Sequence, residues 1–571
     1  MLGEQTNERK FNAMSDNEPS RYNPENLNGR INGKYSNWSR EELIDEITKL
    51  KTRKKYGIVW EWKDENVVEQ CRTKLPVLRN IYDKDVLSNS RAGVNFIIEA
   101  DNYHALSVLN YTHGESIDII YIDPPYNTGN NDFRFNDNYV DREDSYRHSK
   151  WLSFMYRRLK LAKNLLKENG VLFISIDDKE LAELKMLLDD TSLFGEKNFI
   201  ANLIWKSKSG GANDSKFFAI DHEYILVYAK NISSFSLGQD LEAQVSTNYN
   251  QQDEKGQFAL DRLDKQSIRY SKSLDYIIVG PDGKEYRPEH KDPNKPNATW
   301  RWSEETVKER YEELVFKNGH VYTKNYKKEG SVPRSLLIDE RFGRTRTGKT
   351  DLFSIFHGSV FQNPKPVKLI KYLLKIIPNR NALVLDFMAG SGTTGQAVLE
   401  LNNEDGGDRR FILITNNENN IMDEVCYPRV KDVIEKYNSL KNGENGNLGY
   451  NLKYFNTSFV DAKPTDANKK KLVESSTDML CLKENCFNLI LEGEYYKIYG
   501  GQKDTLLGII YDDDGIEEAK TRFRELGLKT VVYIFSLDDS NKAEEFSDLK
   551  DLVEVKPIPA SILNVYRRIF R

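Results

Sequence analysis

The stretch ALVLDFMAGSGTTG, residues 382–395, decides the fold. An apolar run ends at Asp386 and is followed by closely spaced glycines and then by residues that suit a helix. Gly390 and Gly392 have no Cβ, so the backbone there can approach a ligand, and the amide groups that begin a helix can face its polar groups. The pattern predicts a strand, a tight loop and a helix that bind a nucleotide-like cofactor. A purely structural turn is the alternative.

Other apolar runs lie on both sides of this loop, with helical patterns between them. The runs are VNFIIEAD (residues 94–101), SIDIIYIDPPY (116–126), GVLFISIDD (170–178) and RRFILITNNE (409–418). Strands that alternate with helices form a parallel sheet covered by helices. The sequence therefore predicts an open α/β domain whose sheet is built from two chain segments, residues 91–235 and 353–462.

The remaining regions differ from this pattern. At Ser39 the residues S-R-E-E predict the start of a helix, because a serine and a glutamate at this spacing satisfy two backbone amides. We expect four further regions: a disordered polar tail (1–36), a helical N-terminal region (37–90), an irregular insert (236–352) and a small α/β C-terminal domain (463–571).

The composition of the 571 residues, 39% hydrophobic and 30% charged, describes a multidomain protein with a well-solvated surface. No apolar run approaches the roughly 18 residues of a membrane span and no signal core is visible, so we expect no membrane contact and a cytoplasmic location. The four cysteines are scattered, which predicts neither disulfides nor a metal site. The net charge of −5 leaves room for a local basic patch, and residues 324–349 hold eight basic against three acidic residues.

The residues DPPY, 123–126, follow an apolar run that delivers Asp123 to the end of a strand, where open α/β sheets bind ligands. Consecutive prolines continue neither a strand nor a helix, and their carbonyl groups can accept hydrogen bonds. The Asp123 carboxylate and the Pro124 carbonyl can accept from one amino group, while Tyr126 offers a face to a planar ring. The pattern predicts a site for the exocyclic amine of a nucleobase, with a strand-ending proline turn as the alternative.

The segment GSGTTG also satisfies the dinucleotide pattern G-x-G-x-x-G, and Glu418 ends the next strand about 20 residues on. This spacing alone does not separate NAD from S-adenosylmethionine. Asp386 at the strand end favours S-adenosylmethionine, as do the hydroxyl groups of Thr393 and Thr394, which stand where a pyrophosphate would require bare backbone.

DPPYNTG before LDFMAGSGTTG, with FQNPKP (residues 361–366) just ahead of the latter, resembles the amino-methylating DNA methyltransferases of the β arrangement. In that group the catalytic block precedes the cofactor block, and a target-recognition segment lies between them. More closely, RKKYGIVWE, IIEADNYHAL, SIDDKE, HEYILVYAK and LITNNE are similar to the modification subunits of type III restriction-modification systems. The likeness covers roughly residues 40–460. It implies a Rossmann-like, S-adenosylmethionine-dependent methyltransferase fold in which residues 236–352 recognise the target.

The resemblance also implies roles for individual residues. The catalytic tetrapeptide, which holds the target amine and stacks on the flipped base, matches Asp123, Pro124, Pro125 and Tyr126. The matches to the cofactor site are Asp386, Phe387, Gly390, Gly392 and Thr393 in the loop, Asn363 and Lys365 in the segment that closes over the methionine part, Asp101 near the adenine, and Glu418 at the ribose, with Asn416 or Asn417 as alternatives. Ala100 stands where the family usually has glycine, which leaves the conformation before Asp101 undecided.

The reaction implied by the resemblance is methyl transfer from S-adenosylmethionine to N6 of adenine in double-stranded DNA. Adenine is favoured over cytosine because Asp rather than Ser stands at position 123. A homodimer and a helicase-nuclease restriction subunit are the expected partners, and an orphan or other defence-system methyltransferase is the alternative. Methylation of a cytosine ring carbon needs a nucleophilic cysteine, commonly in a Pro-Cys pair, and no cysteine here follows a proline.

GRTRTGKT, residues 343–350, is a literal match to the phosphate loop G-x-x-x-x-G-K-[ST]. Such a loop follows a buried strand directly. The residues before Gly343 are IDERF, of which three are charged. We therefore interpret Arg344, Arg346 and Lys349 as contacts to DNA phosphates. A solvated basic loop and a P-loop NTPase are the alternatives.

Two further patterns lie in the insert. TWRWSEE interleaves aromatic and basic side chains, so Trp300 and Arg301 are candidate DNA contacts, although core packing of one tryptophan is favoured over base stacking by both. PDGKEYRPEHK, residues 281–291, has the letters of a nuclease core, but its glycine-bearing turn favours a two-strand hairpin over a metal site.

Overall fold

The structure is a computed structural model. It describes residues 39–41, 43–44, 60–88, 92–210, 215–243, 249–264, 270–290, 298–327, 329–441, 449–501, 504–537, 540 and 542–570. The chain divides into two compact units, Met1–Gly57 and Ile58–Arg571. In the first unit the Leu43 amide donates to the Ser39 carbonyl at 3.0 Å, as the predicted helix start requires. The predicted disordered tail, residues 1–36, lies outside the described residues.

The second unit contains a ten-stranded sheet. In order across the sheet, its strands are β1 (Lys74–Asn80), β18 (Asn451–Asp461), β2 (Val94–Glu99), β17 (Arg410–Thr415), β16 (Leu383–Asp386), β3 (Ile117–Ile122), β6 (Leu166–Ile176), β8 (His222–Ala229), β7 (Phe199–Lys206) and β15 (Leu336–Leu337). The strands from β18 to β6 run parallel, and β8 pairs antiparallel with β6 and β7. This is the Rossmann-like α/β sheet that the sequence predicts.

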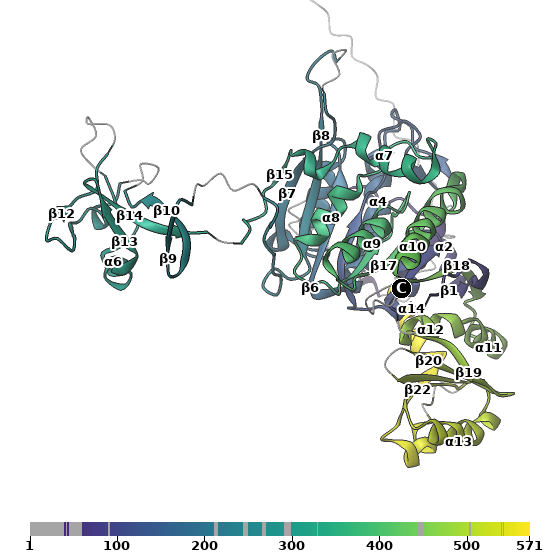
Figure 1. Cartoon of the computed structure of the whole chain (residues 1–571). Helices are drawn as coiled ribbons and strands as arrows, with labels where there is room; N and C mark the ends of the chain where they lie inside the picture. The colour runs from purple at the N-terminus through teal and green to yellow at the C-terminus, as the bar shows by residue number, and fades with distance from the viewer. Residues whose placement is uncertain are drawn as a thin grey trace, which may run out of the picture. The chain divides into compact units, whose positions relative to one another are not determined.

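Helices cover both faces of this sheet. They include α3 (Asn102–Thr112), α4 (Arg147–Leu165), α5 (Leu181–Asp189), α8 (Val367–Lys375), α9 (Thr393–Asp405) and α10 (Tyr427–Lys441). Successive strand residues point to opposite faces, so Ile120 and Ile122 pack with α3 and α4, whereas Ile119 and Tyr121 pack with α8, α9 and α10. Figure 1 shows α8, α9 and α10 over one face. The sheet is thus packed between two helical layers, which leaves the carboxyl ends of its strands as the expected ligand edge.

The helical region predicted for residues 37–90 is wrong in part. It contains α2 (Asn66–Gln70), but Lys74–Asn80 forms β1 at the edge of the main sheet, antiparallel to β18. Leu75, Val77 and Leu78 of this strand are buried. Pro76 weakens the strand signal in the sequence, yet an edge strand tolerates a residue without an N–H group.

The predicted insert has its own sheets, ordered β13-β14-β10-β9 and β11-β12. Its elements are β9 (Gln251–Asp253), β10 (Gly256–Arg262), β11 (Ile278–Val279), β12 (Glu285–Tyr286), α6 (Glu304–Glu309), β13 (Leu314–Lys317) and β14 (His320–Tyr326). The antiparallel pairing of β11 with β12 confirms the hairpin predicted around residues 281–291.

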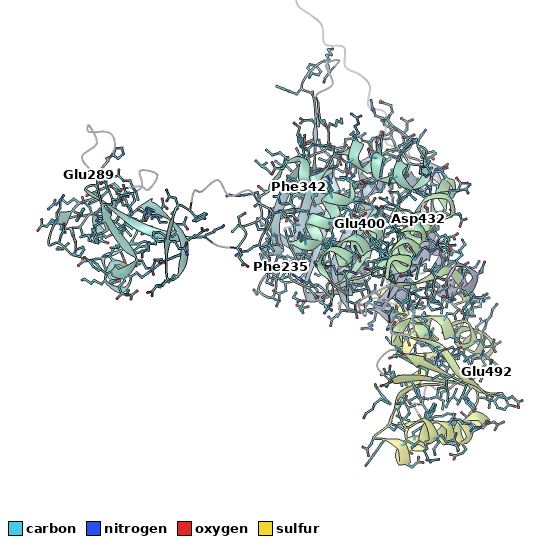
Figure 2. All side chains as sticks on the ribbon, viewed as in Figure 1. Phe235, Glu289, Phe342, Glu400, Asp432 and Glu492 are labelled. Carbon is cyan, nitrogen blue, oxygen red and sulfur yellow. The ribbon has the colours of Figure 1, made fainter. Side chains whose placement is uncertain are left out.

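The insert ends earlier than residue 352. β15 pairs in parallel with β7, and the helix α7 (Thr345–Phe356) follows it. Phe342, labelled in Figure 2, packs against Tyr372 of α8 with ring centroids 4.7 Å apart. Residues from 336 onward therefore belong to the main sheet and its helical layer, because their apolar side chains are buried there.

The C-terminal region forms a five-stranded sheet, ordered β19-β20-β21-β22-β23. Its elements are α11 (Asp466–Ser475), α12 (Thr477–Glu484), β19 (Cys486–Glu492), β20 (Tyr496–Gly501), β21 (Thr505–Ile510), α13 (Ile516–Leu526), β22 (Lys529–Phe535), β23 (Val553–Ile558) and α14 (Ala560–Phe570). These are the elements of a small α/β domain, and the buried Tyr566 hydroxyl of α14 donates to the Pro76 carbonyl at 2.5 Å. Among the helices that the structure describes, none has the length and apolar character of a membrane span.

Candidate active site

Two strand ends that are far apart in the sequence lie side by side in the sheet. β3 and β16 are parallel neighbours, with Val384 opposite Ile119 and Leu385 opposite Ile120. The DPPY loop leaves β3 and the glycine loop leaves β16 at the same carboxyl edge, which is where open α/β sheets bind ligands. The predicted convergence of the two loops is therefore confirmed.

The Asp123 carboxylate is the centre of a charged network. Both of its oxygens accept hydrogen bonds from the Lys365 ammonium at 2.8 Å, although the two residues are 242 positions apart. The Tyr126 hydroxyl lies 2.9 Å from Asp123 Oδ1, 3.0 Å from Glu223 Oε2 and 2.9 Å from Lys365 Nζ. Burial raises the pKa of Tyr126 well above its ordinary value, so the hydroxyl keeps its proton and donates to one carboxylate at a time.

Lys365 has a different place from the one that the resemblance implies. It is expected in a segment that closes over the cofactor, but its buried ammonium faces Asp123 and lies 3.3 Å from Glu223. Burial alone would lower the pKa of Lys365, but the two carboxylates outweigh burial and raise it above its ordinary value. A buried ammonium needs these acids as partners, and the expected cofactor contact of Lys365 stays a prediction.

The second proline of the DPPY loop is held by a helix. Trp151 of α4 is fully buried, and its Nε1 donates to the Pro125 carbonyl at 2.7 Å. This carbonyl is therefore used within the protein. The role of the Pro124 carbonyl as an acceptor for a substrate amine stays a prediction.

Sequence reasoning missed two acids at this edge. Asn127 has a left-handed backbone, with φ 55°, and its Nδ2 donates to the buried Glu180 carboxylate at 2.6 Å. Burial raises the pKa of Glu180 to about 8. Glu223 is the second residue of β8, next to Tyr224, which pairs with Ile176 at the end of β6. The sequence feature that could have indicated Glu180 and Glu223 is their position. Each lies next to the carboxyl end of β6, which is the neighbour of β3 in the sheet.

The conformation of the glycine loop is held by hydrogen bonds to Asp386 and by close packing around Gly392. The buried Asp386 carboxylate accepts from the Thr394 hydroxyl at 2.6 Å and from the Met388 amide at 3.0 Å. Burial, opposed in part by these bonds, raises the pKa of Asp386 to about 7. Gly392 has φ +77°, and a Cβ there would lie 3.2 Å from Cys426 Sγ. Both the backbone angle and the close contact therefore require glycine.

Thr393 braces this loop from behind. Its hydroxyl accepts a hydrogen bond from Arg429 at 2.9 Å, and the same buried guanidinium donates to the Ser391 carbonyl at 3.1 Å. Thr393 is itself buried at the start of α9. The Thr393 hydroxyl thus faces the protein interior, and the expected contact of Thr393 with the cofactor stays a prediction.

A cavity of about 560 Å³ lies beside the glycine loop. Its walls include Ala100, Asp101, Asn102, Pro125, Asp132, Phe387, Met388, Gly390, Thr415, Asn416 and Glu418. Small-molecule sites typically enclose about 300–1,000 Å³. Of the predicted cofactor residues, those that line this cavity are Asp101, Phe387, Gly390 and Glu418.

Asp101 and Glu418, the two predicted cofactor acids, are among the carboxylates that line the cavity. Asp101 caps α3 and lies 3.4 Å from the guanidinium of Arg158, which is buried and pairs with Glu65 at 2.6 Å. Glu418 pairs with Arg134 at 2.9 Å. These two carboxylate acceptors therefore each have an arginine partner.

Alanine at position 100 fits the loop that precedes Asp101. Ala100 is not among the described residues with positive φ, and its amide donates to the Thr415 carbonyl at 3.1 Å. Asp101 has φ −59°, which any residue adopts. The departure from the family's glycine therefore leaves this loop intact.

A larger cleft of about 1810 Å³ adjoins the cavity. It is lined by Asp123, Tyr126, Asn363 and Lys365 and by the basic residues Lys179, Lys208, Arg346 and Lys349. Pro125, Asp132 and Glu418 line both spaces. The two spaces therefore meet beside the DPPY loop, and Asn363 faces the cleft.

The octapeptide GRTRTGKT is not a phosphate loop. Gly343 follows a 3-10 turn (Glu340–Phe342) rather than a strand, and the next residues begin α7. Gly348 lies inside α7, where a Cβ would be 2.2 Å from the Pro364 carbonyl oxygen. Glycine at this position therefore allows α7 to pack against the segment that carries Lys365.

The basic residues of this octapeptide have different environments. Arg344 is buried and donates to the carbonyl groups of Asp339 at 3.0 Å and Ile338 at 2.5 Å. Its predicted phosphate contact is corrected, because its guanidinium is used to hold the chain before α7. Arg346 and Lys349 line the cleft, and their contact with DNA stays a prediction.

Of the predicted DNA contacts in the insert, that of Trp300 is corrected, whereas Arg301 is partly exposed and its contact stays a prediction. Trp300 is buried in the core of the insert, and its Nε1 donates to the Tyr276 carbonyl at 2.8 Å. Arg301 pairs with Asp261 at 3.1 Å and donates to the Thr323 hydroxyl at 2.7 Å. Core packing of one tryptophan, the favoured alternative, is confirmed, because the buried ring is not open to a base.

The protein-family model described as DNA methylase matches residues 117–424. The StyLTI Mod subunit, a type III restriction-modification enzyme of Salmonella typhimurium, is 31% identical over 458 residues, which are 71% of this chain and 66% of that protein. The EcoPI Mod subunit of Escherichia phage P1, also type III, is 34% identical over 57% of this chain and 58% of that protein. The type II methyltransferase M.KpnI of Klebsiella pneumoniae is 35% identical over 60% of this chain and 83% of that enzyme.

The chain matches less than two thirds of the length of the two Mod subunits. The matched family region begins at β3 and extends beyond Glu418, so it contains both the Asp123 network and the glycine loop. The region that carries the site is therefore the region that carries the likeness, and the chain belongs to the DNA methylase family.

Proposed function

We propose that the chain transfers a methyl group from S-adenosylmethionine to the exocyclic amine N6 of adenine in double-stranded DNA. The observation that carries this proposal is the meeting of the two spaces, which share Pro125, Asp132 and Glu418 in their walls. A base in the cleft and a cofactor in the cavity would lie on two sides of one loop. Reacting atoms must approach to about 3 Å, and this arrangement allows it.

The cavity suits S-adenosylmethionine, which supplies a methyl group on a positively charged sulfur. The Asp101 and Glu418 carboxylates would accept hydrogen bonds from its amino or hydroxyl groups. Gly390 and Phe387 would form the wall beside them. Glu418 is the candidate for the ribose hydroxyl groups, and such binding would compete with its ion pair to Arg134. The acidic walls also complement a positively charged ligand.

The residues of the DPPY loop would prepare the amine. An exocyclic amine is a weak nucleophile because its lone pair is delocalised into the ring. Hydrogen bonds from its two protons to the Asp123 carboxylate and the Pro124 carbonyl would favour a tetrahedral, more nucleophilic nitrogen. Asp123 does not need to remove a proton first. After transfer, the proton that leaves the nitrogen would have the Asp123 carboxylate as its nearest acceptor.

Lys365 would set the charge around this acceptor. Its ammonium donates to both Asp123 oxygens, so the target amine must share or replace these bonds. A fixed cation beside the carboxylate costs no reorganisation during the reaction. Glu223 offsets the added positive charge and holds the other side of the ammonium. The network would therefore orient Asp123 before the base arrives.

Adenine inside a duplex is out of reach of this network, so the base must leave the stack. Tyr126 is the candidate stacking surface, because its hydroxyl is held by the Asp123 and Glu223 carboxylates. Arg346 and Lys349 line the same cleft and would contact phosphates of the substrate. The cleft would thus receive one extruded nucleotide and part of the backbone.

We further infer that the chain acts as the modification subunit of a type III restriction-modification system, as a homodimer with a helicase-nuclease partner. The likeness to the StyLTI and EcoPI Mod subunits supports this inference. The likeness to M.KpnI supports the alternative, a methyltransferase that works without such a partner. Sedimentation of the purified 66.2 kDa chain tests the dimer, and ATP-dependent DNA cleavage by co-purified proteins tests the restriction partner.

The direct test is transfer of a labelled methyl group from S-adenosylmethionine to mixed-sequence DNA without ATP. We expect label in the DNA with the parent chain and none above background with Asp123→Ala. Lys349→Ala serves as a second variant, with ATP hydrolysis measured in parallel. Absence of label with the parent, together with ATP hydrolysis that Lys349→Ala abolishes, would restore the NTPase alternative and remove the methyltransferase proposal.

A further inference from the structure

The connection between β7 and β8 carries two outward-facing aromatic rings. Phe217 is 82% exposed and Phe218 is 93% exposed. The Ser215 hydroxyl donates to the Phe218 carbonyl at 3.0 Å, so a local bond helps to shape the turn that presents the rings. Two adjacent phenylalanines with this exposure present a large apolar area to water. Contact with a partner would bury that area.

This connection lies at the edge of the sheet where Asp123 lies. Tyr224 of β8 pairs with Ile176 at the end of β6, so the residues before β8 are at the carboxyl edge of the parallel strands. In Figure 1 the described parts of the connection, residues 207–210 and 215–221, project beyond the strand ends above β8. The residues of this connection that line the Asp123 cleft are Ser207, Lys208 and Ile220. Phe217 and Phe218 therefore lie on a connection that contributes to the wall of the cleft at both of its ends.

A cation lies beside one of the two rings, and further lysines lie on the same connection. Lys216 Nζ lies 5.5 Å from the centroid of the Phe217 ring. Lys206 and Lys208 stand at the base of the connection, where Asp221 lies 3.7 Å from the Lys206 ammonium. Cations beside an apolar projection match a duplex, whose phosphates flank its stacked bases.

We propose that Phe217 and Phe218 enter the DNA duplex beside the target adenine and fill the place that the flipped base leaves in the stack. The inference rests on the proposed function and concerns the DNA partner of that same site. Tyr126 lines the cleft and would stack on the extruded base, whereas the two phenylalanines do not line it and are exposed on the adjoining connection. Apolar side chains that insert between base steps compensate for lost stacking, which makes flipping less costly.

The test compares the parent chain with the Phe217→Ala/Phe218→Ala double variant on two synthetic duplexes. Both duplexes carry a site mapped beforehand by sequencing methylated adenines in plasmid DNA treated with the parent. In one duplex the target adenine is paired with thymine, and in the other it faces an abasic position. Leu440→Ala, which removes another exposed apolar side chain, 68% exposed and on α10, serves as the matched control.

We expect the double variant to methylate the paired duplex at least about tenfold more slowly than the parent, while Leu440→Ala stays within about twofold. We expect the rate on the abasic duplex to return to within about threefold of the parent, because the adenine there has no partner to lose. Unchanged rates on the paired duplex would overturn the proposal, and so would equal losses on both duplexes. No methylation of plasmid DNA by the parent would instead contradict the proposed function.

Discussion

Asp123 and Asp386 end neighbouring parallel strands, yet their surroundings are opposite. Asp123 is partly exposed at the wall of the large cleft and bonds to the ammonium of Lys365. Asp386 is buried and bonds to the Thr394 hydroxyl and the Met388 amide of its own loop. The Asp123 carboxylate faces the cleft. The Asp386 carboxylate instead bonds within the glycine loop, which forms part of the wall of the neighbouring cavity.

This difference shows that a strand end at the ligand edge fixes where an acid lies but not what it does. The residues after the strand decide the role. The prolines after Asp123 offer no amide that could satisfy the carboxylate locally. The residues after Asp386 supply an amide and a hydroxyl within eight positions. We therefore expect chemistry to depend on Asp123 and cofactor binding to depend on Asp386.

Asp123→Asn gives the largest expected effect. An amide has one acceptor and adds a donor that would face both the target amine and Lys365, so we expect the rate of methyl transfer to fall on the order of 10²–10³-fold. Binding of S-adenosylmethionine, measured by calorimetry, should stay within about twofold.

Asp386→Asn is the matched control on the neighbouring strand. We expect it to weaken binding of S-adenosylmethionine more than Asp123→Asn does, because its carboxylate holds the loop beside the cavity. Equal effects of the two variants on rate and on binding would break the comparison between the two acids.

Lys365→Met comes next. It leaves Asp123 and Glu223 without their shared cation, and we expect the rate to fall on the order of tenfold to a hundredfold. Affinity for S-adenosylmethionine should change little, because the ammonium faces the cleft. If Lys365→Met lost affinity for the cofactor but kept its rate at saturating cofactor, Lys365 would have the cofactor-binding role that the resemblance implies. Lys365→Arg, which keeps the charge, should recover part of the rate.

Gly348→Ala tests the packing that places Lys365. Its Cβ would lie 2.2 Å from the Pro364 carbonyl oxygen, so we expect a loss of about 1–3 kcal/mol in the free energy of unfolding. Gly210→Ala is the control, because nothing lies within 4 Å of a Cβ there. Urea unfolding measures both variants, and equal stabilities would contradict the close contact of α7 with the Lys365 segment.

The pH dependence of Asp386 is the smallest expected effect. Its pKa of about 7 exceeds the ordinary value of 3.8, so the folded state holds a proton that the unfolded state releases, and stability falls as pH rises towards 7. Asp386→Asn cannot titrate. Relative to the parent, we expect its free energy of unfolding to rise by about 1.4 kcal/mol between pH 6 and pH 8. Urea unfolding at both pH values measures this difference, and a constant difference would contradict the raised pKa.

Sequence reasoning located the two loops because their signals are local. An apolar run, an acid and then prolines or glycines describe a strand end within about a dozen residues. The convergence of the loops followed from the rule that parallel strands present their carboxyl ends at one edge. The sheet order then placed β3 beside β16, as the two-segment sheet requires.

The contacts that sequence reasoning missed depend on chain segments that fold over this edge. Lys365 reaches Asp123 across 242 positions because α7 packs on the segment before α8. Arg344 stands in a basic stretch typical of DNA contact, but carbonyl groups of its own chain take its guanidinium. Neither contact has a local pattern, since the same residues in an exposed loop would have the same spacing.

The central claim is that the Asp123 network acts on the N6 amine of adenine. The most direct measurement is mass spectrometry of nucleosides digested from plasmid DNA after reaction with S-adenosylmethionine that carries a deuterated methyl group. We expect the label in N6-methyldeoxyadenosine with the parent chain, and none with Asp123→Asn, although that variant still binds the cofactor. Label in deoxycytidine, or undiminished label in adenine with Asp123→Asn, would contradict the account.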